Sequence, residues 1–143
     1  QVVHRGPAES PIATTVSVPA MSDTLYVSGL LPDPVTPASA DGKTPAVYGD
    51  TETQSRSVFR KIAATLAERG MSAGDVVMMR VYLAAPAGAE RMDFAGMMKA
   101  YREFYGTPDQ PNKPARATIQ VAALAAPQFL VEIEVTAAKA PAK

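Results

Sequence analysis

Residues 114–136 constrain the fold of this chain more than any other stretch, because they hold two apolar segments with charged residues at alternate positions, separated by a short break at Pro127. Side chains of an extended strand point alternately to the two faces of a sheet. In the first segment this alternation separates Ala117, Ile119 and Val121 from Arg116, Thr118 and Gln120. In the second it separates Val131, Ile133 and Val135 from Glu132 and Glu134. The pattern predicts two strands, each with one apolar face and one face that carries charge.

Two interpretations account for the charges at Arg116, Glu132 and Glu134. In the first, the charged residues lie on a solvated outer face of an antiparallel sheet, as most Glu-Ile-Glu alternations do. In the second, Arg116 anchors a planar anion, because its rigid fork of N–H donors matches a carboxylate. A hydrogen bond to a charged group contributes about 1.5 to 3 kcal/mol. The alternation alone does not decide between the two.

The rest of the chain predicts an α+β fold with one mixed sheet. Residues 14–18 and 24–29 alternate around a turn and predict a β-hairpin, and residues 76–83 form an apolar run typical of a central strand. One helix starts at Asp50 or Thr51, and a second starts at Asp93 and stops at Gly106. The order ββ, α, β, α, ββ places two helices on one face of the sheet. The other face lacks cover, so we expect the protein to bury it by oligomerising.

A chain of 143 residues suits one domain, which we assign to residues 1–143. We expect an irregular arm at residues 1–12, where Pro7 and Pro11 interrupt any periodicity. Residues 31–49 predict a long proline-rich loop, which is either a mobile insertion or a functional element. The alanine- and lysine-containing tail at residues 137–143 is expected to fray.

Charge and cysteine content argue against several classes of function. Lysine plus arginine equals aspartate plus glutamate at 14 each, so the chain has no electrostatic footprint for nucleic acid or for an anionic membrane. No apolar run reaches the roughly 18 residues of a membrane-spanning helix. The lack of cysteine rules out disulfides and thiol catalysis. The chain begins at Gln1 and has flanks rich in Ala, Pro and Thr, so we expect an exported bacterial protein, periplasmic or secreted, with the cytoplasm as the alternative.

Several short motifs resemble those of the RidA/YjgF family. They are S-G-L at residues 28–30, G-D-T-E-T-Q at 49–54, G-D-V-V-M-M-R-V-Y-L at 74–83, A-Y-R-E-F-Y-G at 100–106, P-A-R-A-T-I-Q-V-A-A-L at 114–124 and V-E-I-E at 131–134. The motifs cover nearly the whole chain, and their common order and spacing are far more specific than any one of them.

This resemblance implies a chorismate-mutase-like fold, assembled as a homotrimer whose sheets form a central barrel with a pocket at each subunit interface. Family members of the RidA type hydrolyse reactive 2-imino acids, or their enamine tautomers, to 2-oxo acids and ammonia without a metal or an organic cofactor. The resemblance implies that Arg116 binds the substrate carboxylate and that Glu132 handles the protons of the attacking water or the leaving amine. Ser28 and Gly29 are expected to line the pocket, and Glu134 is an alternative to Glu132.

Three positions depart from the family pattern. The family has a tyrosine near Thr15, a substrate-facing asparagine at Met98 and a cysteine at Thr118. We include all three among the substrate-binding residues and expect a more apolar pocket. Two other functions stay open: a non-catalytic trimer that binds a small carboxylate or a partner, and an endoribonuclease, an activity attributed to some relatives. The neutral charge and the lack of a histidine near Arg116 or Glu132 count against the endoribonuclease.

Overall fold

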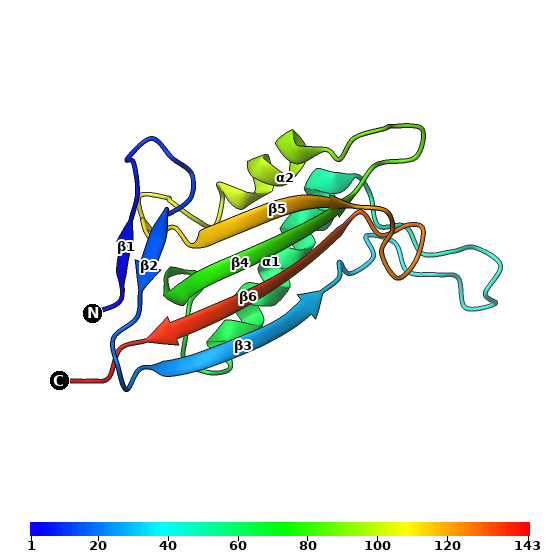
Figure 1. Ribbon diagram of the computed structural model, residues 1–143. Coiled ribbons are helices and arrows are strands. Elements are labelled where there is room, and N and C mark those ends of the chain that lie inside the picture. The colour runs from blue at the N-terminus through cyan, green and yellow to red at the C-terminus, as the bar shows by residue number, and fades with distance from the viewer.

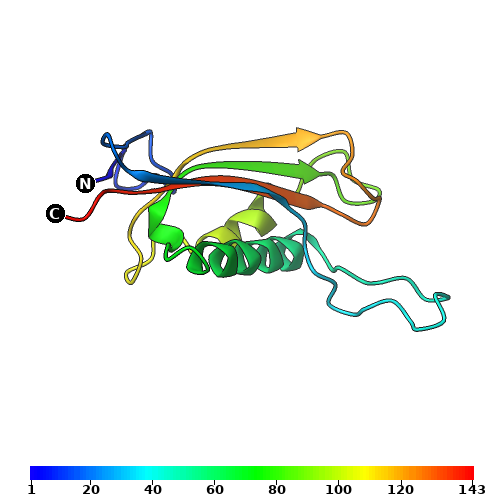
Figure 2. The same cartoon turned by 90° about the horizontal axis from the view of Figure 1, so that it is seen from below.

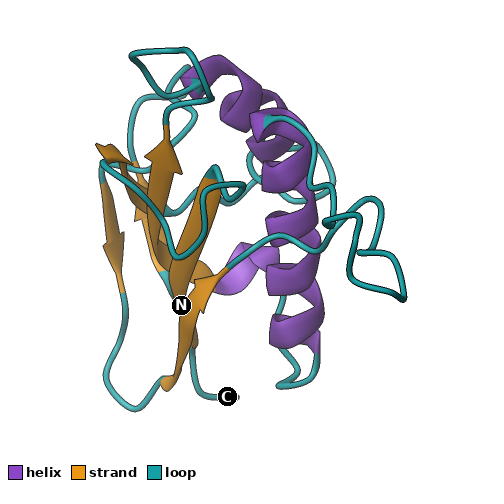
Figure 3. Ribbon diagram, turned by 90° about the vertical axis from the view of Figure 1, so that its right-hand side faces the viewer, coloured by secondary structure: helices purple, strands orange, loops and turns teal.

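The computed structural model describes residues 1–143 and shows a four-stranded sheet with two helices on one of its faces (Figures 1 and 3). Seen from below, the sheet lies above both helices (Figure 2). This architecture confirms the predicted fold class. In chain order the elements are β1 (Val3–Arg5), β2 (Thr15–Ser17), β3 (Asp23–Leu30), α1 (Thr51–Ala67), the short 3-10 helix η1 (Ala73–Asp75), β4 (Val76–Ala84), α2 (Phe94–Tyr101), β5 (Ala115–Val121) and β6 (Val131–Lys139).

The strands of the main sheet follow the order β3-β6-β4-β5. Strand β6 lies antiparallel to both β3 and β4, whereas β4 and β5 are parallel. Parallel neighbours need a crossover connection, and α2 is the helix in the connection between β4 and β5. Strands β3 and β5 therefore form the two edges of the sheet.

Each of the two α-helices begins after an aspartate that caps it. Asp50 Oδ1 accepts a hydrogen bond from the backbone N–H of Thr53 at 2.9 Å, and Asp93 Oδ1 accepts one from Gly96 at 3.0 Å. Each bond satisfies a backbone donor that the first turn of a helix leaves without a partner. Asp50, and not Thr51, is therefore the cap of α1. No helix in the chain has the length and apolar character needed to span a membrane.

One face of the sheet packs against both helices and forms the core. Its strand residues include Met79, Val81, Leu83, Val131, Ile133 and Val135, and its helix residues include Val58, Phe59, Ile62, Leu66, Met97 and Tyr101. The alternation predicted for β6 is confirmed, because its three apolar residues at odd positions all enter this core. Gln54 is also buried and joins α1 to the start of β6, since its Nε2 donates to Gln128 O and its Oε1 accepts from Leu130 N.

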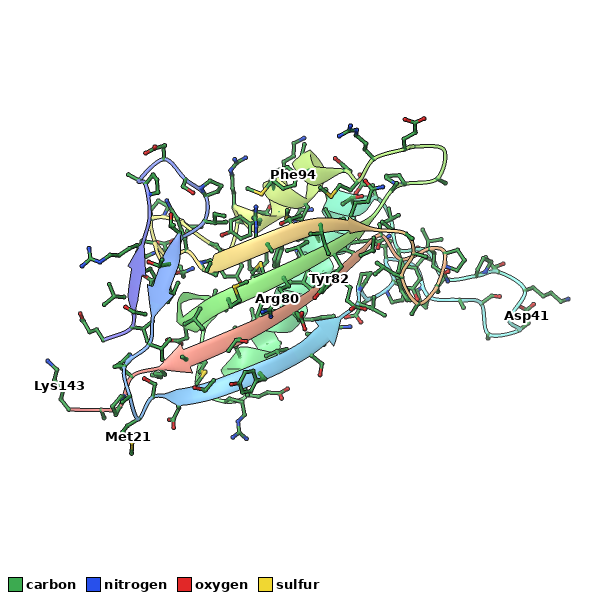
Figure 4. All side chains as sticks on the ribbon, in the orientation of Figure 1. Met21, Asp41, Arg80, Tyr82, Phe94 and Lys143 are labelled. Carbon is green, nitrogen blue, oxygen red and sulfur yellow. The ribbon has the colours of Figure 1, made fainter.

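The opposite face of the sheet has no helix over it (Figure 1). By the alternation of the strands it presents Arg80 and Tyr82 of β4, Glu132 and Glu134 of β6, and Tyr26 of β3. Tyr26 is 79% exposed. Figure 4 labels Arg80 and Tyr82 in the middle of this open face. The prediction that one face lacks cover is confirmed for the single chain.

The first thirty residues pair differently from the prediction. Residues 14–18 and 24–29 do not form a hairpin, because β2 pairs with β1 and β3 pairs with β6. The irregular arm expected at residues 1–12 is wrong in part, since Val3–Arg5 forms β1. Strand β2 has only three residues, two of them exposed, so it lacks an apolar face to place on the main sheet. The longer β3 can bury such a face, and it finds its partner at the far end of the chain.

The frayed tail expected at residues 137–143 begins later than predicted. Strand β6 continues to Lys139, and Ala137 and Ala138 are almost fully buried. These two alanines pair with Leu25 and Thr24 of β3. Pairing with a distant strand therefore orders residues whose composition alone suggested a mobile end.

Residues 31–49 contain no helix or strand and form an arm that extends beyond the sheet (Figures 1 and 2). Asp41 lies at its tip (Figure 4). The two sides of the arm meet at an antiparallel bridge, in which Val47 N donates to Thr36 O at 2.8 Å. Near its base, Lys61 of α1 forms a salt bridge of 3.0 Å with Asp33.

Replacing Ile133 by alanine is expected to lower the free energy of unfolding by about 2 to 5 kcal/mol, because Ile133 is fully buried at the centre of the sheet. Urea denaturation of parent and variant at one fixed protein concentration measures this loss, because the stability of a protein that associates depends on its concentration. Val35→Ala is the matched control: Val35 lies in the arm, is 61% exposed and should change stability by less than about 0.5 kcal/mol. Equal losses for the two variants would contradict this description of the core.

Candidate functional site

Arg116 lies on β5 with its side chain on the helical face of the sheet, in register with Met79 of β4. Its Nη1 donates a hydrogen bond to Met98 Sδ at 3.1 Å. Its Cζ lies 4.6 Å from the centre of the Tyr101 ring and 5.8 Å from the centre of the Phe94 ring. Helix α2 therefore covers the guanidinium with a thioether and two aromatic rings; Phe94, at the start of this helix, is labelled in Figure 4.

The guanidinium of Arg116 is a partly buried charge without a counterion. None of the four salt bridges of the chain includes it. Its Nε is buried and has no hydrogen-bond partner, and its Nη2 makes no hydrogen bond within the chain and stays at the surface. Burial lowers the pKa of Arg116, Tyr101 opposes that effect and Arg102 adds to it. An arginine stays protonated in such a setting, so the site favours an anion that would pair with it.

Two of the three residues that depart from the family pattern lie beside Arg116. Met98 is 4% exposed and contacts the guanidinium directly. Thr118 follows two residues along β5, and its Oγ1 is buried without a hydrogen-bond partner. Thr15 does not join them, because it lies exposed in β2, opposite Arg5. The structure thus gathers Met98, Thr118 and Arg116 between β5 and α2.

Glu132 lies on the other face of the sheet from Arg116. Ser28 and Gly29 lie beside it on β3, where the pairing with β6 shifts register between Val27 and Leu30. A Cβ added at Gly29 would lie 2.6 Å from Glu132 Oε2, so the carboxylate rests against the glycine backbone. The structure therefore brings Ser28, Gly29 and Glu132 together and separates them from Arg116. A single chain holds the predicted site in two parts.

Arg80 and Tyr82 distinguish Glu134 from Glu132. Tyr82 Oη donates a hydrogen bond to Glu134 Oε1 at 2.5 Å, and Arg80 Nη1 lies 3.9 Å from the same oxygen. This hydrogen bond is the main cause that raises the pKa of Tyr82, and burial adds to it. Glu132 makes no side-chain hydrogen bond or salt bridge within the chain, so it is the carboxylate with free acceptors. The sequence prediction did not include Tyr82, although it follows Arg80 at the two-residue spacing of one strand face.

Arg116 and Glu132 line none of the five main cavities of the chain. The largest of these, of about 600 Å³, lies between α1 and residues 33–35, and two of its cations, Arg56 and Lys61, are already in salt bridges. The chain also has no group of three or more His, Asp or Glu side chains placed to hold a metal ion. Beside Arg116 the single chain therefore provides one wall of a site, and not an enclosed pocket.

Comparisons of sequence and fold give matches over nearly the whole chain. The sequence model of a family described as endoribonuclease L-PSP matches residues 7–139. A RutC family protein of Pyrococcus abyssi is 31% identical, over 97% of each chain. A putative reactive intermediate deaminase, TdcF of Escherichia coli K12, is 27% identical over 87% of this chain and 86% of its own. Among solved structures, RidA from an Antarctic Psychrobacter species has a TM-score of 0.60 and 29% identity, and the match covers 92% of this chain and 95% of that one.

Arg116→Met is expected to leave the free energy of unfolding within about 1 kcal/mol of the parent value, or to raise it, because methionine removes a partly buried charge that lacks a counterion. Arg56→Met is the control, since Arg56 pairs with Glu103 at 2.7 Å and with Glu52 at 3.6 Å. Loss of these exposed pairs should lower stability by about 0.2 to 1 kcal/mol. Urea denaturation of both variants tests the contrast, and a loss above about 2 kcal/mol for Arg116→Met would assign this arginine a structural role.

Proposed function

The chain belongs to the endoribonuclease L-PSP family, which includes the RidA/YjgF proteins, and from this premise we propose that it is a hydrolytic deaminase. Its substrates are reactive 2-imino acids or their enamine tautomers, and its products are 2-oxo acids and ammonia. The relative TdcF, whose name describes a putative deaminase of reactive intermediates, supports the reaction class. The setting of Arg116 supports the choice of a carboxylate-bearing substrate.

The observation that carries this proposal is the guanidinium of Arg116 with no anion of its own chain beside it. The substrate carboxylate binds Nη2 and Nη1 side by side, in the bidentate geometry that arginine and carboxylate share. In doing so it replaces Met98 Sδ at Nη1, because a thioether is a much weaker acceptor than a carboxylate. The positive charge also favours deprotonation of the bound acid, so the substrate stays anionic.

Glu132 acts on the water in this proposal. The water oxygen adds to the imine carbon, while Glu132 accepts a proton from the water and returns it to the imine nitrogen. Glu132 then accepts the hydroxyl proton of the tetrahedral adduct and passes it to the amine nitrogen, so that ammonia leaves as the carbonyl forms and Glu132 ends in the state in which it began. Its free acceptors support this role, whereas the carboxylate of Glu134 is already held by Tyr82 and Arg80.

Assembly of several copies completes the site in this proposal. Arg116 and Glu132 lie on opposite faces of one sheet, and β5 and β3 are its opposite edges. In a ring of three copies, β5 of one copy meets the β3 side of the next, so that Arg116 of the first approaches Glu132 and Gly29 of the second. The uncovered face of the sheet supports association of copies, because such a face is ordinarily buried in this way, and the number three comes from the resemblance to the RidA/YjgF family.

A non-catalytic protein that binds a small carboxylate is the second candidate. It is favoured by the small number of polar groups beside Arg116, since Met98 supplies only a sulfur atom and the hydroxyl of Thr118 is buried. Such a site can bind an anion without positioning a water. An RNA-cleaving activity has less support, since the formal net charge is zero and Nδ1 of the one histidine, His4, lies 2.7 Å from Lys113 O.

Arg116→Ala is expected to abolish imine hydrolysis, because the substrate loses its anchor, while the oligomer stays intact. Imines generated in situ by an amino-acid oxidase serve as substrates, and ammonia release above the uncatalysed rate is the measurement. Light scattering after gel filtration checks the assembly, and Arg56→Ala serves as an arginine control remote from β5. Unchanged turnover in Arg116→Ala would remove this arginine from the mechanism. No acceleration by the parent protein, together with Arg116-dependent binding of 2-oxo acids, would favour the binding protein.

Glu132→Gln should lower kcat/KM by at least about 100-fold, the usual scale of losing a general acid–base group. Glu134→Gln is the matched variant two residues away and should lower it by less than about tenfold, because Glu134 is engaged by Tyr82 and Arg80. The same imine assay measures both. The reverse order of effects would transfer the proton-handling role to Glu134.

A further inference from the structure

The side chains of α2 that contact Arg116 are a thioether and two aromatic rings. Phe94, Met98 and Tyr101 follow one another at helical spacing, and we call them the α2 wall. All three lie near the guanidinium, at the distances given above. The hydroxyl of Tyr101 is not available to a ligand, because it donates a hydrogen bond to Pro11 O at 2.8 Å. Tyr101 is fully buried and Met98 is 4% exposed, so Phe94 is the part of the wall that a ligand meets first, and the wall has no free polar atom.

The polar side chains of β5 near this wall are also unavailable to a ligand, because they are hydrogen-bonded within the chain or buried. Gln120 fastens the loop before α2, because its Oε1 accepts from Met92 N at 2.8 Å and its Nε2 donates to Glu90 O at 3.0 Å. The hydroxyl of Thr118 is buried, so a ligand at the surface does not reach it. Apart from Arg116, this side of the site holds no polar group for a substrate side chain to bind.

The position of Arg116 sets where a substrate side chain meets the wall. A carboxylate bound to Nη1 and Nη2 replaces Met98 Sδ, so the carbon atoms next to the carboxylate lie against Met98. Phe94 lies farther from the guanidinium than Tyr101 does, and it is 43% exposed. A ring this exposed at the start of α2 remains available to a longer apolar side chain.

We propose that the α2 wall selects 2-imino acids with an extended apolar side chain, of the leucine or phenylalanine type, over those with a small or polar one. The inference rests on the proposed function in taking Arg116 as the carboxylate anchor. Each added methylene that the wall covers improves kcat/KM by about 10-fold or more in a well-fitted site, and a polar side chain there loses its hydrogen bonds to water without replacement. Met98 and Phe94 are the specificity-determining residues.

The test compares imines made from leucine, alanine and asparagine, because leucine and asparagine are close in size and differ in polarity. An amino-acid oxidase generates each imine, and its disappearance is followed by competition with semicarbazide. Rates are divided by the uncatalysed rate of the same imine, so that intrinsic reactivity cancels. The leucine imine should be preferred at least about tenfold over each of the other two. Equal values, or a preference for alanine or asparagine, would overturn the inference.

Variants of the wall connect this preference to its residues. Phe94→Ala, at a half-exposed position that should fold normally, is expected to reduce the leucine-to-alanine ratio to below about threefold. Met98→Asn should do the same, and Met98→Leu, which stays apolar, should keep the parent ratio. A ratio that neither Phe94→Ala nor Met98→Asn changes would show that the selectivity arises elsewhere and would refute the role of the wall.

A binding experiment separates this inference from the deaminase proposal. Calorimetric titration of the parent protein with 4-methyl-2-oxopentanoate and with pyruvate, the 2-oxo acids that correspond to leucine and alanine, requires no catalysis. The longer acid should bind at least about tenfold more tightly, and Phe94→Ala should remove that advantage. If no imine is hydrolysed but this difference in binding is present, the deaminase proposal is refuted and the apolar selectivity of the α2 wall is supported. If imines are hydrolysed without preference and both acids bind equally, the selectivity of the α2 wall is refuted and the deaminase proposal is supported.

Discussion

The charge of Arg116, which has no counterion within the chain, is the constraint on which the candidate site depends. Folding places a guanidinium between a strand and a helix, and the chain supplies sulfur and aromatic rings in place of a carboxylate. Aromatic rings compensate part of the cost of burial, by about 0.5 to 2 kcal/mol for a cation over a ring, but they leave the N–H donors unmatched. An arrangement that favours an external anion is therefore built into the packing of α2 on β5.

The division of the sheet into two unlike faces explains why one chain does not complete a site. Alternation along β6 sends its apolar residues into the core and leaves Glu132 on the open face, while the same alternation along β5 sends Arg116 toward the helices. Neither residue can change face without a one-residue shift of its strand, which would expose the core. Any chemistry that uses both residues must therefore draw them from different copies.

Sequence alone predicted the elements with strong periodicity and failed where long-range pairing decides. The existence of both helices and the faces of β6 were predicted, because apolar spacing and capping residues are local signals, although α2 ends at Tyr101 and not at Gly106. In β5 the alternation was predicted but not its direction, since Ile119 lies on the open face and is 49% exposed. The partner of β3 was not, since nothing near residues 24–29 indicates that residues 133–139 lie beside them. The residues of the candidate site divide in the same way between those that a local motif indicates and those that depend on long-range pairing. The resemblance supplied Arg116 and Glu132, whereas the bond between Tyr82 and Glu134 depends on a strand register that no short motif encodes.

The arm at residues 31–49 carries its own backbone bridge and meets the body of the protein near its base. Its tip is consequently insulated from the packing of the core, and the entropy of closing a loop rises only slowly with length. The length and the side chains of such a segment can change while the sheet and helices stay unchanged. A change in the length of the arm should therefore cost the sheet and helices little stability.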